Sequence, residues 1–355
     1  MSNEILNNID WGVLSKYIDD DLITVNKHPE YDLYLLNYTH HVKLQNKWDL
    51  YTRSCRGLVI DILGNIIARP FQKFKEIDGL DISKLETSKK FEIFEKLDGS
   101  LGITFYYEEE FKWITTTKGS FTSVQAIEAD KMLNERYDKL DKSYTYLFEI
   151  IYPENRIIIN YNNKSDMFLL SAIHTKIGIE LSYDQINNDY SNSFSIVRKY
   201  IFKGLTDLYD LKKLEIENRE GFVIRFYNDY RIKVKFKRYD ILHRLMKFVS
   251  VPLIWKELKV NGNIDNILNK IPEDLLKNAP SEFNKLLDET VNGLNYQYRE
   301  IENNVLKIYI LLYNSDRKLF ANNALKSRYS SILFKIYDNK CYEETIWKMI
   351  KPKLL

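Results

Sequence analysis

The spacing of apolar residues changes character about two-thirds of the way along the chain. Before residue 244, short runs of alternating or β-branched apolar residues recur, which is typical of strands half-buried in a sheet. After that point, apolar residues repeat at helical spacing and strand patterns almost vanish. The sequence therefore predicts an α+β protein, with an antiparallel-sheet domain at residues 1–243 and a small all-α domain at residues 244–355. We expect the boundary near Leu242 to Val251.

Turn signals such as Leu63-Gly64-Asn65 and Tyr152-Pro153-Glu154-Asn155 separate several of the strand runs. We expect strands at residues 58–62, 91–96, 101–107, 111–116, 146–151, 156–160, 222–227 and 231–237. One helical pattern interrupts them at residues 123–140. In the second region we expect helices within residues 252–258, 265–271, 273–278, 281–313, 325–338 and 342–354. Pro272 and Pro280 stand where two of these helices would begin.

Charge and cysteine content exclude several classes of protein. The 52 basic and 50 acidic residues give a net charge of +2, which argues against polybasic binding but is compatible with a local basic groove. Cys55 and Cys341 form no CxxC motif, which predicts neither a disulfide framework nor a zinc site and favours a reducing, cytoplasmic location. We expect no signal peptide and no membrane span, because the longest apolar run, Val305–Tyr313, is short and contains Lys307.

The sharpest motif is Lys96-Leu97-Asp98-Gly99-Ser100, which stands between two expected strands. A lysine at a strand end beside a tight Asp-Gly turn is held out of the sheet, where a nucleotide could reach it. By itself the motif is weak, since a lysine-rich chain of this length contains it by chance roughly one time in ten. Its ordinary interpretation is a hairpin turn with a solvated lysine.

Other blocks accompany this motif along the chain and give a functional interpretation more weight. Two precede it: Arg56-Gly57-Leu58-Val59-Ile60-Asp61 and Arg69-Pro70-Phe71-Gln72-Lys73-Phe74. Four follow it: Thr117-Lys118-Gly119-Ser120, Leu147-Phe148-Glu149-Ile150-Ile151-Tyr152-Pro153, Glu220-Gly221-Phe222-Val223-Ile224 and Arg231-Ile232-Lys233-Val234-Lys235-Phe236-Lys237.

The last block has a basic face if it forms a strand throughout. A period of two places Arg231, Lys233, Lys235 and Lys237 together, opposite its apolar residues. Such a strand is either an outer strand with a solvated face or a group of cations directed at phosphates. The carboxylates have ordinary interpretations too. Glu220 could be an ordinary glutamate at a strand end, and Glu149 could be a buried acid that pairs with a neighbour such as Arg156.

Together these blocks resemble the covalent nucleotidyltransferase superfamily of ligases and capping enzymes. More closely, they resemble the phage-type RNA ligase 1 family, known for tRNA repair. The closer likeness rests on the blocks beginning at Arg56 and Arg69, and the C-terminal Ile346–Pro352 also looks like that family's ending. The resemblance implies an ATP-grasp-like nucleotidyltransferase domain ahead of a helical domain linked to tRNA recognition. It implies an ATP-dependent ligase that joins 5′-phosphate and 3′-hydroxyl RNA ends, with cleaved tRNA as a candidate substrate.

The resemblance also implies roles for individual residues. Lys96 would attack the α-phosphate of ATP and carry AMP covalently, and Lys235 and Lys237 would contact that phosphate as catalytic cations. The strand Phe168–Ala172 resembles the family's adenine-flanking segment. The other implied ligands of ATP and Mg²⁺ are Arg56, Lys73 and Lys118 for the triphosphate, Glu149 for the ribose hydroxyls and Glu220 for the metal.

The proposed nucleophile must lose a proton before it reacts. Lysine has an ordinary pKa near 10.4 and is almost wholly protonated at neutral pH. Because neighbouring cations and desolvation lower a lysine pKa, we expect Lys235 and Lys237 to depress the pKa of Lys96 and to stabilise the phosphoryl charge. Arg231 and Lys233 are additional basic residues in this strand. The residues that contact phosphate could therefore lie two positions earlier than Lys235 and Lys237.

Two alternatives remain. A DNA ligase or a GTP-dependent capping enzyme normally carries an OB module after the basic strand, whereas helices follow here. A non-catalytic RNA-binding relative is disfavoured because the implied nucleophile, carboxylates and cations occur together. There is no GxxxxGK[ST] loop, so we expect any end-healing kinase or phosphatase to be a separate protein. The five histidines show no paired spacing and are interpreted as structural, and we expect a monomer.

Overall fold

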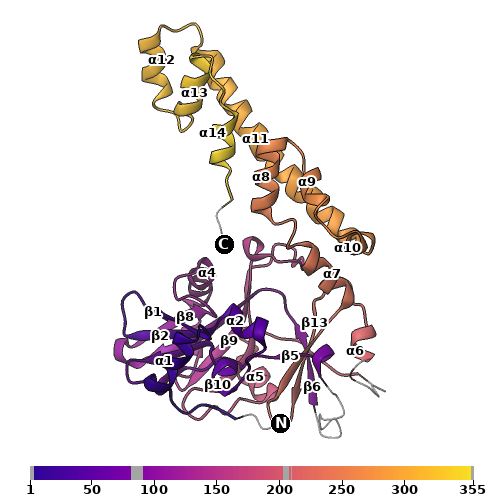
Figure 1. Ribbon diagram of the computed structural model, residues 1–355. Helices are drawn as coiled ribbons and strands as arrows, with labels where there is room; N and C mark the ends of the chain where they lie inside the picture. Colours follow the sequence, from indigo (N-terminus) through magenta and orange to yellow (C-terminus); the bar gives the residue numbers. More distant parts are fainter. Residues whose placement is uncertain (1–3, 81–90, 203–207, 209, 353–355) are drawn as a thin grey trace. The chain divides into compact units, whose positions relative to one another are not determined.

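The computed structural model describes residues 4–80, 91–202, 208 and 210–352, and the chain divides into two compact units, Met1–Tyr239 and Asp240–Leu355. The first unit mixes strands with helices, and the described part of the second is helical (Figure 1). The predicted α+β class, with antiparallel-rich sheets followed by helices, is confirmed.

The first unit contains three sheets. The N-terminal sheet has the strand order β1 (Ile23–Lys27), β2 (Leu33–Tyr38), β3 (Arg56–Asp61) and β4 (Ile66–Ala68). The second sheet has the order β11 (Ser195–Ile196), β10 (Asp166–His174), β9 (Tyr144–Ile151), β7 (Ser100–Tyr107) and β8 (Lys112–Thr117). The third has the order β12 (Lys199–Tyr200), β6 (Phe91–Lys96), β13 (Gly221–Phe226), β14 (Arg231–Lys235) and β5 (Lys75–Glu76). Pairing is antiparallel except between β10 and β11 and between β14 and β5.

The second sheet is central to the packing of this unit. Leu35 and Val59 of the N-terminal sheet pack with Phe105 and Leu147 of the second sheet in one buried core. A further core forms where the second sheet meets α4 (Val124–Leu133) and α5 (Tyr183–Tyr190). The remaining helices of this unit are α1 (Trp11–Asp19), α2 (His40–Gln45), α3 (Leu50–Ser54) and α6 (Asp210–Lys213). Burying one large apolar side chain contributes about 1.5–3 kcal/mol, so these shared cores hold the two sheets in a fixed relation.

The lysine motif lies where the chain passes from the third sheet to the second. Strand β6 pairs with β12 and β13, whereas β7 pairs with β8 and β9. The ordinary interpretation of the Asp-Gly turn as a hairpin is therefore wrong, because the strands on its two sides belong to different sheets. Leu97 is buried with Phe94, Ile151 and Val197 between these sheets.

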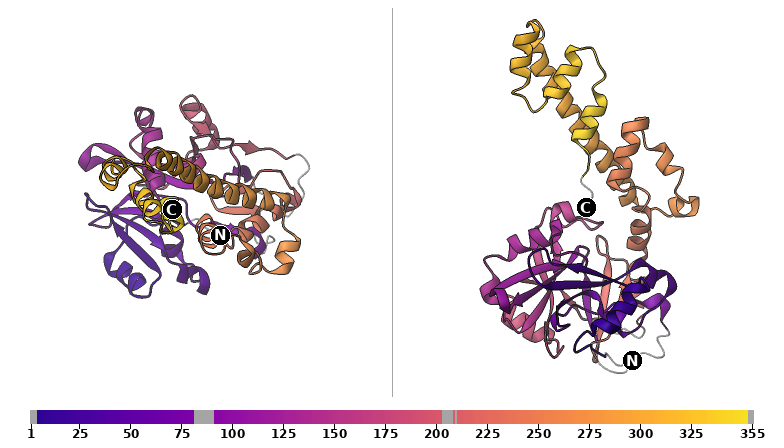
Figure 2. Two further views of the ribbon diagram at one scale, coloured as in Figure 1. Left: turned by 90° about the horizontal axis from the view of Figure 1, so that it is seen from above. Right: turned by 60° about the vertical axis from the view of Figure 1, so that its left-hand side comes forward.

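The second unit is built around one long helix. Helix α7 (Lys237–Leu245) spans the division between the units. Figure 2 shows α11 (Ser281–Leu312) running beside α8 (Val251–Asn261), and α11 also contacts α13 (Ser330–Tyr337) and α14 (Glu343–Met349). The short helices are α9 (Asp265–Leu268), α10 (Glu273–Lys277) and α12 (Arg317–Ala324). The buried core contains Val305, Phe320, Ile332, Leu333 and Ile346. None of the described helices is long and apolar enough to cross a membrane.

Two expected elements are wrong. Residues 156–160 were expected to form a strand, but they form a loop in which the consecutive residues Ile158 and Ile159 are both buried. Their backbone amides donate to the Asp98 carboxylate instead of to a neighbouring strand. The helix expected at 123–140 ends at Leu133, and only a short 3-10 turn follows, at Tyr137–Lys139.

Candidate active site

Strand register brings the predicted nucleophile and a predicted cation to the two sides of one residue. Gly221, the first residue of β13, pairs with Lys96 on β6 and with Lys235 on β14. Glu220 precedes it and therefore lies between the two lysines. Lys96 Nζ donates to Glu220 Oε2 at 2.7 Å, and Lys235 Nζ lies 3.9 Å from Glu220 Oε1. The Glu220 side chain is 4% exposed and that of Lys96 is 23% exposed, so part of the lysine side chain remains open to solvent.

Gly221 is required by this arrangement. Its φ is +150°, and a Cβ at this position would lie 2.0 Å from the Val234 carbonyl oxygen. We expect Gly221→Ala to lower the free energy of unfolding by about 2 kcal/mol or more, because strained backbone of this kind costs about 1–3 kcal/mol. Urea denaturation measures the change. Gly119→Ala is the control, since nothing lies within 4 Å of its Cβ position, and equal stability losses in both variants would contradict the prediction.

Asp98 fixes the backbone that carries Lys96. Its carboxylate accepts the Ile158 and Ile159 amides at 3.0 Å each and the Tyr239 hydroxyl at 2.6 Å. The Asp98 amide in turn donates to the Tyr161 hydroxyl at 2.9 Å. Buried carboxylates with several donors are rigid anchors. Asp98 therefore positions Lys96 rather than facing a substrate.

Glu149 on β9 contacts the glycine of the Lys96–Ser100 motif. The Gly99 amide donates to Glu149 Oε1 at 2.9 Å, and a Cβ on Gly99 would lie 2.5 Å from the Ile150 carbonyl oxygen. Burial raises the pKa of Glu149 to about 7, although the positive charge of Lys96 opposes the rise. Glycine at position 99 thus allows β9 to bring this carboxylate close to the nucleophile.

The electrostatic setting of Lys96 differs from the expected one. Burial acts to lower the pKa of its amine, but the negative charges of Glu220 and Glu149 outweigh burial and raise the pKa above its ordinary value. The prediction that positive neighbours depress the pKa of Lys96 is therefore wrong for the protein without nucleotide. The physical reason is the direct hydrogen bond to Glu220, whose charge dominates over that of the more distant lysines.

A cation cluster lies near this pair, and it includes the three predicted triphosphate ligands. Burial lowers the pKa of Lys73 to about 8, and the nearby charges of Lys233 and Arg56 lower it further. Burial likewise lowers the pKa of Lys118 to about 8, with Arg56 and Lys43 adding to the effect. Arg56 Nη1 is buried and has no hydrogen-bond partner among the described residues. Cations that crowd each other in this way are stabilised when an anion binds between them.

The basic face of the last strand is shorter than expected. Strand β14 ends at Lys235, and Lys237 begins α7 as an exposed residue. Lys233 Nζ instead forms an ion pair with Glu76 Oε1 at 2.7 Å, and the charges of Lys235 and Lys96 act on it. Arg231 is buried and paired with Glu180. The structure thus brings Lys233 and Lys235 near Lys96, whereas Lys237 is exposed at the start of α7.

Several contributors carried no clear sequence signal. Asp98 was part of the motif but had no predicted role, and Tyr239 and Tyr161 were not identified because their contacts join residues far apart in the chain. Lys43 on α2 was also missed. The predicted adenine-flanking strand forms part of β10, where Phe168 pairs with Glu149, so this segment adjoins the site.

The site offers few ligands to a metal. No group of three or more His, Cys, Asp or Glu side chains is placed to hold a metal ion within the described ranges. Mg²⁺ commonly uses one or two carboxylates and takes its other ligands from phosphates and water. The buried carboxylate of Glu220 therefore fits a metal shared with a nucleotide, but not a metal held by protein alone.

Comparison with known proteins shows one consistent likeness. A family described as RNA ligase matches residues 54–239, which is more than half of the chain. A putative bifunctional polynucleotide kinase/RNA ligase of Autographa californica nuclear polyhedrosis virus is 25% identical over 294 residues, covering 74% of this chain. This chain spans only 40% of the length of that viral protein.

Two further comparisons agree. A putative RNA ligase of Thermovibrio ammonificans is 24% identical over 257 residues, which cover 68% of this chain and 67% of that protein. Among solved structures, an archaeal ATP-dependent RNA ligase superposes with a TM-score of 0.51 at 14% identity, covering 80% of this chain and 76% of that one. The structural likeness is one of fold.

Proposed function

Since the chain belongs to the RNA ligase family that its residues 54–239 match, we propose that it is an ATP-dependent RNA ligase that carries AMP on Lys96. The observation that supports this most is the placement of the Lys96 amine at a strand end, against a buried carboxylate and beside a second lysine. A solvated lysine in a hairpin turn would have neither neighbour. The amine is held by a hydrogen bond to a group that can accept its proton, and part of the Lys96 side chain is open to solvent.

The first chemical step requires a neutral Lys96, and Glu220 can take its proton. The ion pair and the neutral amine–carboxylic acid pair contain the same number of protons, and desolvation favours the neutral pair. Burial already raises the pKa of Glu220, because its charged form is desolvated. We infer that a nucleotide covering the open side of Lys96 removes more water and shifts the proton from Lys96 Nζ to Glu220 Oε2.

The bond changes in this step balance. The proton that Lys96 Nζ gives up before the attack goes to Glu220. A bond then forms between Lys96 Nζ and the α-phosphorus of ATP, the bond from that phosphorus to pyrophosphate breaks, and the second proton of the nitrogen leaves with the pyrophosphate. Lys235 and Lys233 would stabilise the oxygens of the α-phosphate, and Arg56, Lys73 and Lys118 those of the leaving pyrophosphate. Glu149 would accept hydrogen bonds from the ribose hydroxyls. Glu220 would hold Mg²⁺ only in its ionised form, after it has passed the proton from Lys96 to water, and the metal would then supply further charge neutralisation at the phosphates.

Two further transfers would complete the cycle. AMP moves from Lys96 to the 5′-phosphate of RNA, and a 3′-hydroxyl then attacks that phosphate while AMP leaves. RNA ends would be held mainly through their phosphates, with sequence preference secondary. Cleaved tRNA is one candidate substrate, and the unpaired thiols of Cys55 and Cys341 favour a reducing, cytoplasmic setting.

One incubation tests the proposal. The protein is mixed with α-labelled ATP and Mg²⁺ and then denatured, and the label remaining on the protein is measured. We expect stable label with ATP and none with GTP; label from GTP would favour a capping enzyme. Absence of label from either nucleotide would favour a non-catalytic relative. Joining of 5′-phosphorylated RNA but not DNA strands separates an RNA ligase from a DNA ligase.

Because β14 ends at Lys235, the structure gives a prediction about which lysines contact phosphate. We expect Lys235→Ala to slow formation of the AMP adduct by about 100-fold or more, as loss of one charge-stabilising donor does elsewhere. Lys237→Ala should change the rate by only about a factor of two, because Lys237 is exposed at the start of α7. Single-turnover rates with labelled ATP provide the measurement. The original assignment of Lys237 would be restored if the two variants were equally slow.

The helical unit is proposed to select structured RNA such as tRNA. A protein ending near Ser250 should form the AMP adduct normally, yet lose about tenfold or more in kcat/KM for cleaved tRNA relative to an unstructured oligonucleotide. Normal adduct formation is the internal control for folding of the first unit. Equal activity of the truncated protein on both substrates would reject a role for this unit in tRNA selection.

A further inference from the structure

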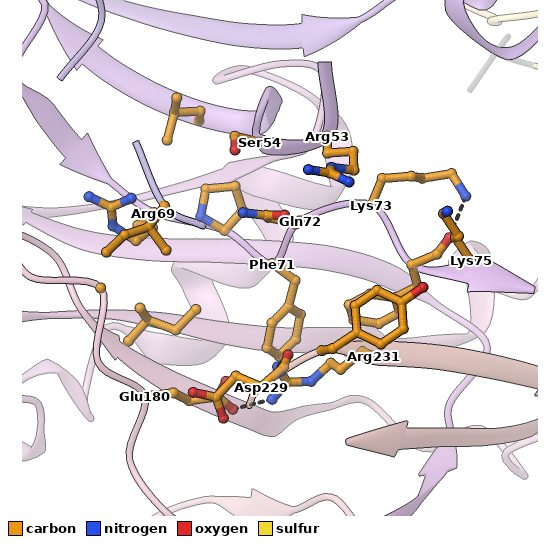
Figure 3. A pocket seen from close by; sticks show the side chains of 17 residues that line it. Arg53, Ser54, Arg69, Phe71, Gln72, Lys73, Lys75, Glu180, Asp229 and Arg231 are labelled. Atoms are coloured by element: carbon orange, nitrogen blue, oxygen red, sulfur yellow. Dashed lines mark hydrogen bonds and ion pairs between the residues drawn. The ribbon is translucent and has the colours of Figure 1, made fainter. Parts of the chain in front are cut away.

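A cavity lies in the first unit between the end of α3, the segment that follows β4 and the turn from β13 to β14 (Figure 3). Arg53 and Ser54 line it from α3, Arg69 and Lys73 from the segment after β4, and Tyr230 from the turn. The predicted roles use only Lys73 among these five residues. The cavity is thus a feature that the proposed chemistry at Lys96 does not explain.

Unsatisfied hydrogen-bond donors gather around this cavity. In the described part of the chain, eight buried side-chain atoms lack a hydrogen-bond partner, and four of them belong to residues that line it. These atoms are Arg53 Nε, Ser54 Oγ, Arg69 Nη2 and the Tyr230 hydroxyl oxygen. The Arg69 and Ser54 residues are each only 7% exposed. All four groups can donate a hydrogen bond, and leaving such groups unpaired costs about 1–3 kcal/mol each.

The cavity also has an excess of positive charge. The two carboxylates that line it form ion pairs with arginines other than Arg53 and Arg69. Glu180 pairs with Arg231, and Asp229 Oδ1 lies 2.6 Å from Arg225 Nη2. Among the described residues, the Arg69 side chain donates to two carbonyl oxygens, from Nη1 to Leu6 at 2.8 Å and from Nε to Thr175 at 3.2 Å, and these bonds hold its Nη2 in place. Burial lowers the pKa of Arg69, with no carboxylate opposing it. A buried guanidinium without a counter-charge favours an anionic ligand.

Two parts of the chain connect the cavity to the active site. Lys73 lines the cavity and also belongs to the cation cluster, where Arg56 and Lys233 act on its charge. Strand β14 begins with Arg231 at the cavity and ends with Lys235 beside Glu220. Four residues of strand span about 13 Å, so the two sites lie along one path.

Resting on the proposed ligase function, we propose that this cavity is a phosphate-binding site and that it holds a backbone phosphate of the RNA strand, away from the end being joined. Two guanidinium groups and two hydroxyls are suited to phosphate oxygens, and arginine is well matched to such recognition. Phosphate contacts of this kind set the register of a strand without reading its sequence. The cavity would therefore hold the strand while its terminus lies at Lys96.

The test replaces single phosphates by neutral methylphosphonates along a 5′-phosphorylated RNA and measures binding by fluorescence anisotropy. In the wild-type protein, one internal position should weaken binding by about tenfold when neutralised. Arg53→Gln should weaken binding of the unmodified RNA similarly, and neutralising that same position should then have no further effect. Ser54→Ala, a milder change, should reduce the effect of that position. Exposed Lys16→Gln is the control and should behave as wild type.

Separate outcomes identify other occupants. Labelling by ATP without RNA should be unchanged in Arg53→Gln; a parallel loss of labelling would assign the cavity to nucleotide phosphates and overturn the proposal. If the effects of Arg53→Gln and of a neutralised phosphate were additive at every RNA position, the cavity would hold no RNA phosphate and the proposal would be overturned. The same would follow if Arg53→Gln did not affect RNA binding. The binding assay needs no catalysis, so it stays informative if no AMP adduct forms and the ligase proposal itself fails.

Discussion

Replacement of Lys96 by alanine should leave no AMP attached to the protein after incubation with labelled ATP. The proposed cycle begins with a bond between Lys96 Nζ and phosphorus. Lys96 Nζ donates a hydrogen bond to the buried Glu220 carboxylate, whereas Lys235 Nζ lies 3.9 Å from it. Denaturing gels with α-labelled ATP provide the measurement.

The cycle also predicts what this variant retains. The last transfer uses RNA that already carries AMP and does not need the amine of Lys96. Lys96→Ala should therefore still join a chemically pre-adenylated RNA to a 3′-hydroxyl end, at a rate that can be measured without ATP. Retained labelling of Lys96→Ala would contradict the assignment of the nucleophile. Loss of both activities, with normal folding, would show that Lys96 has a second role in the final step.

Replacement of Glu220 by glutamine should slow adduct formation by about 10²–10⁴-fold, the range that a positioned acid or base contributes. The variant keeps a carbonyl oxygen near Lys96 Nζ but loses the carboxylate that takes its proton, together with the negative charge that lies 3.9 Å from Lys235 Nζ. Glu154→Gln is the matched control, because Glu154 is an exposed residue of the turn after β9. Single-turnover rates measure both.

The pH dependence of this variant has a definite sign. In the wild type, the reactive neutral pair has the same number of protons as the ion pair, so the rate should change little with pH below the raised pKa of Lys96. Without the carboxylate the pKa of Lys96 falls and its amine must lose a proton to solvent, so the rate of the variant should increase with pH up to a much lower plateau. An unchanged pH profile would show that Glu220 does not control the protonation of Lys96.

The class of fold and several residues of the candidate site could be predicted from the sequence. Lys96 at the end of a strand, Glu220 at the start of another and the basic strand all follow from local patterns. Local patterns could not predict the register, that is, which residues pair between neighbouring strands. The pairing of Gly221 with both Lys96 and Lys235 depends on three strands from distant parts of the chain. Only that pairing places Glu220 between two lysines and reverses the expected pKa shift of Lys96.

The errors have the same origin. A period of two continues through Lys237, but the strand ends at Lys235, and the helix that follows carries Tyr239 to the carboxylate of Asp98. The expected strand at 156–160 has suitable residues, yet its amides are taken by the same carboxylate. Asp98 therefore contacts both of the segments that differ from expectation. A single carboxylate, distant in sequence from both segments, leaves no periodic signal in either of them.

The most direct test of the account is to identify the modified residue. The protein is incubated with ATP and Mg²⁺, digested under conditions that preserve a phosphoramidate, and its peptides are sequenced by tandem mass spectrometry. The account predicts one adenylate, on the side chain of Lys96. Adenylate on Lys233, Lys235 or another residue, or an unmodified Lys96 in a protein that joins RNA, would contradict it.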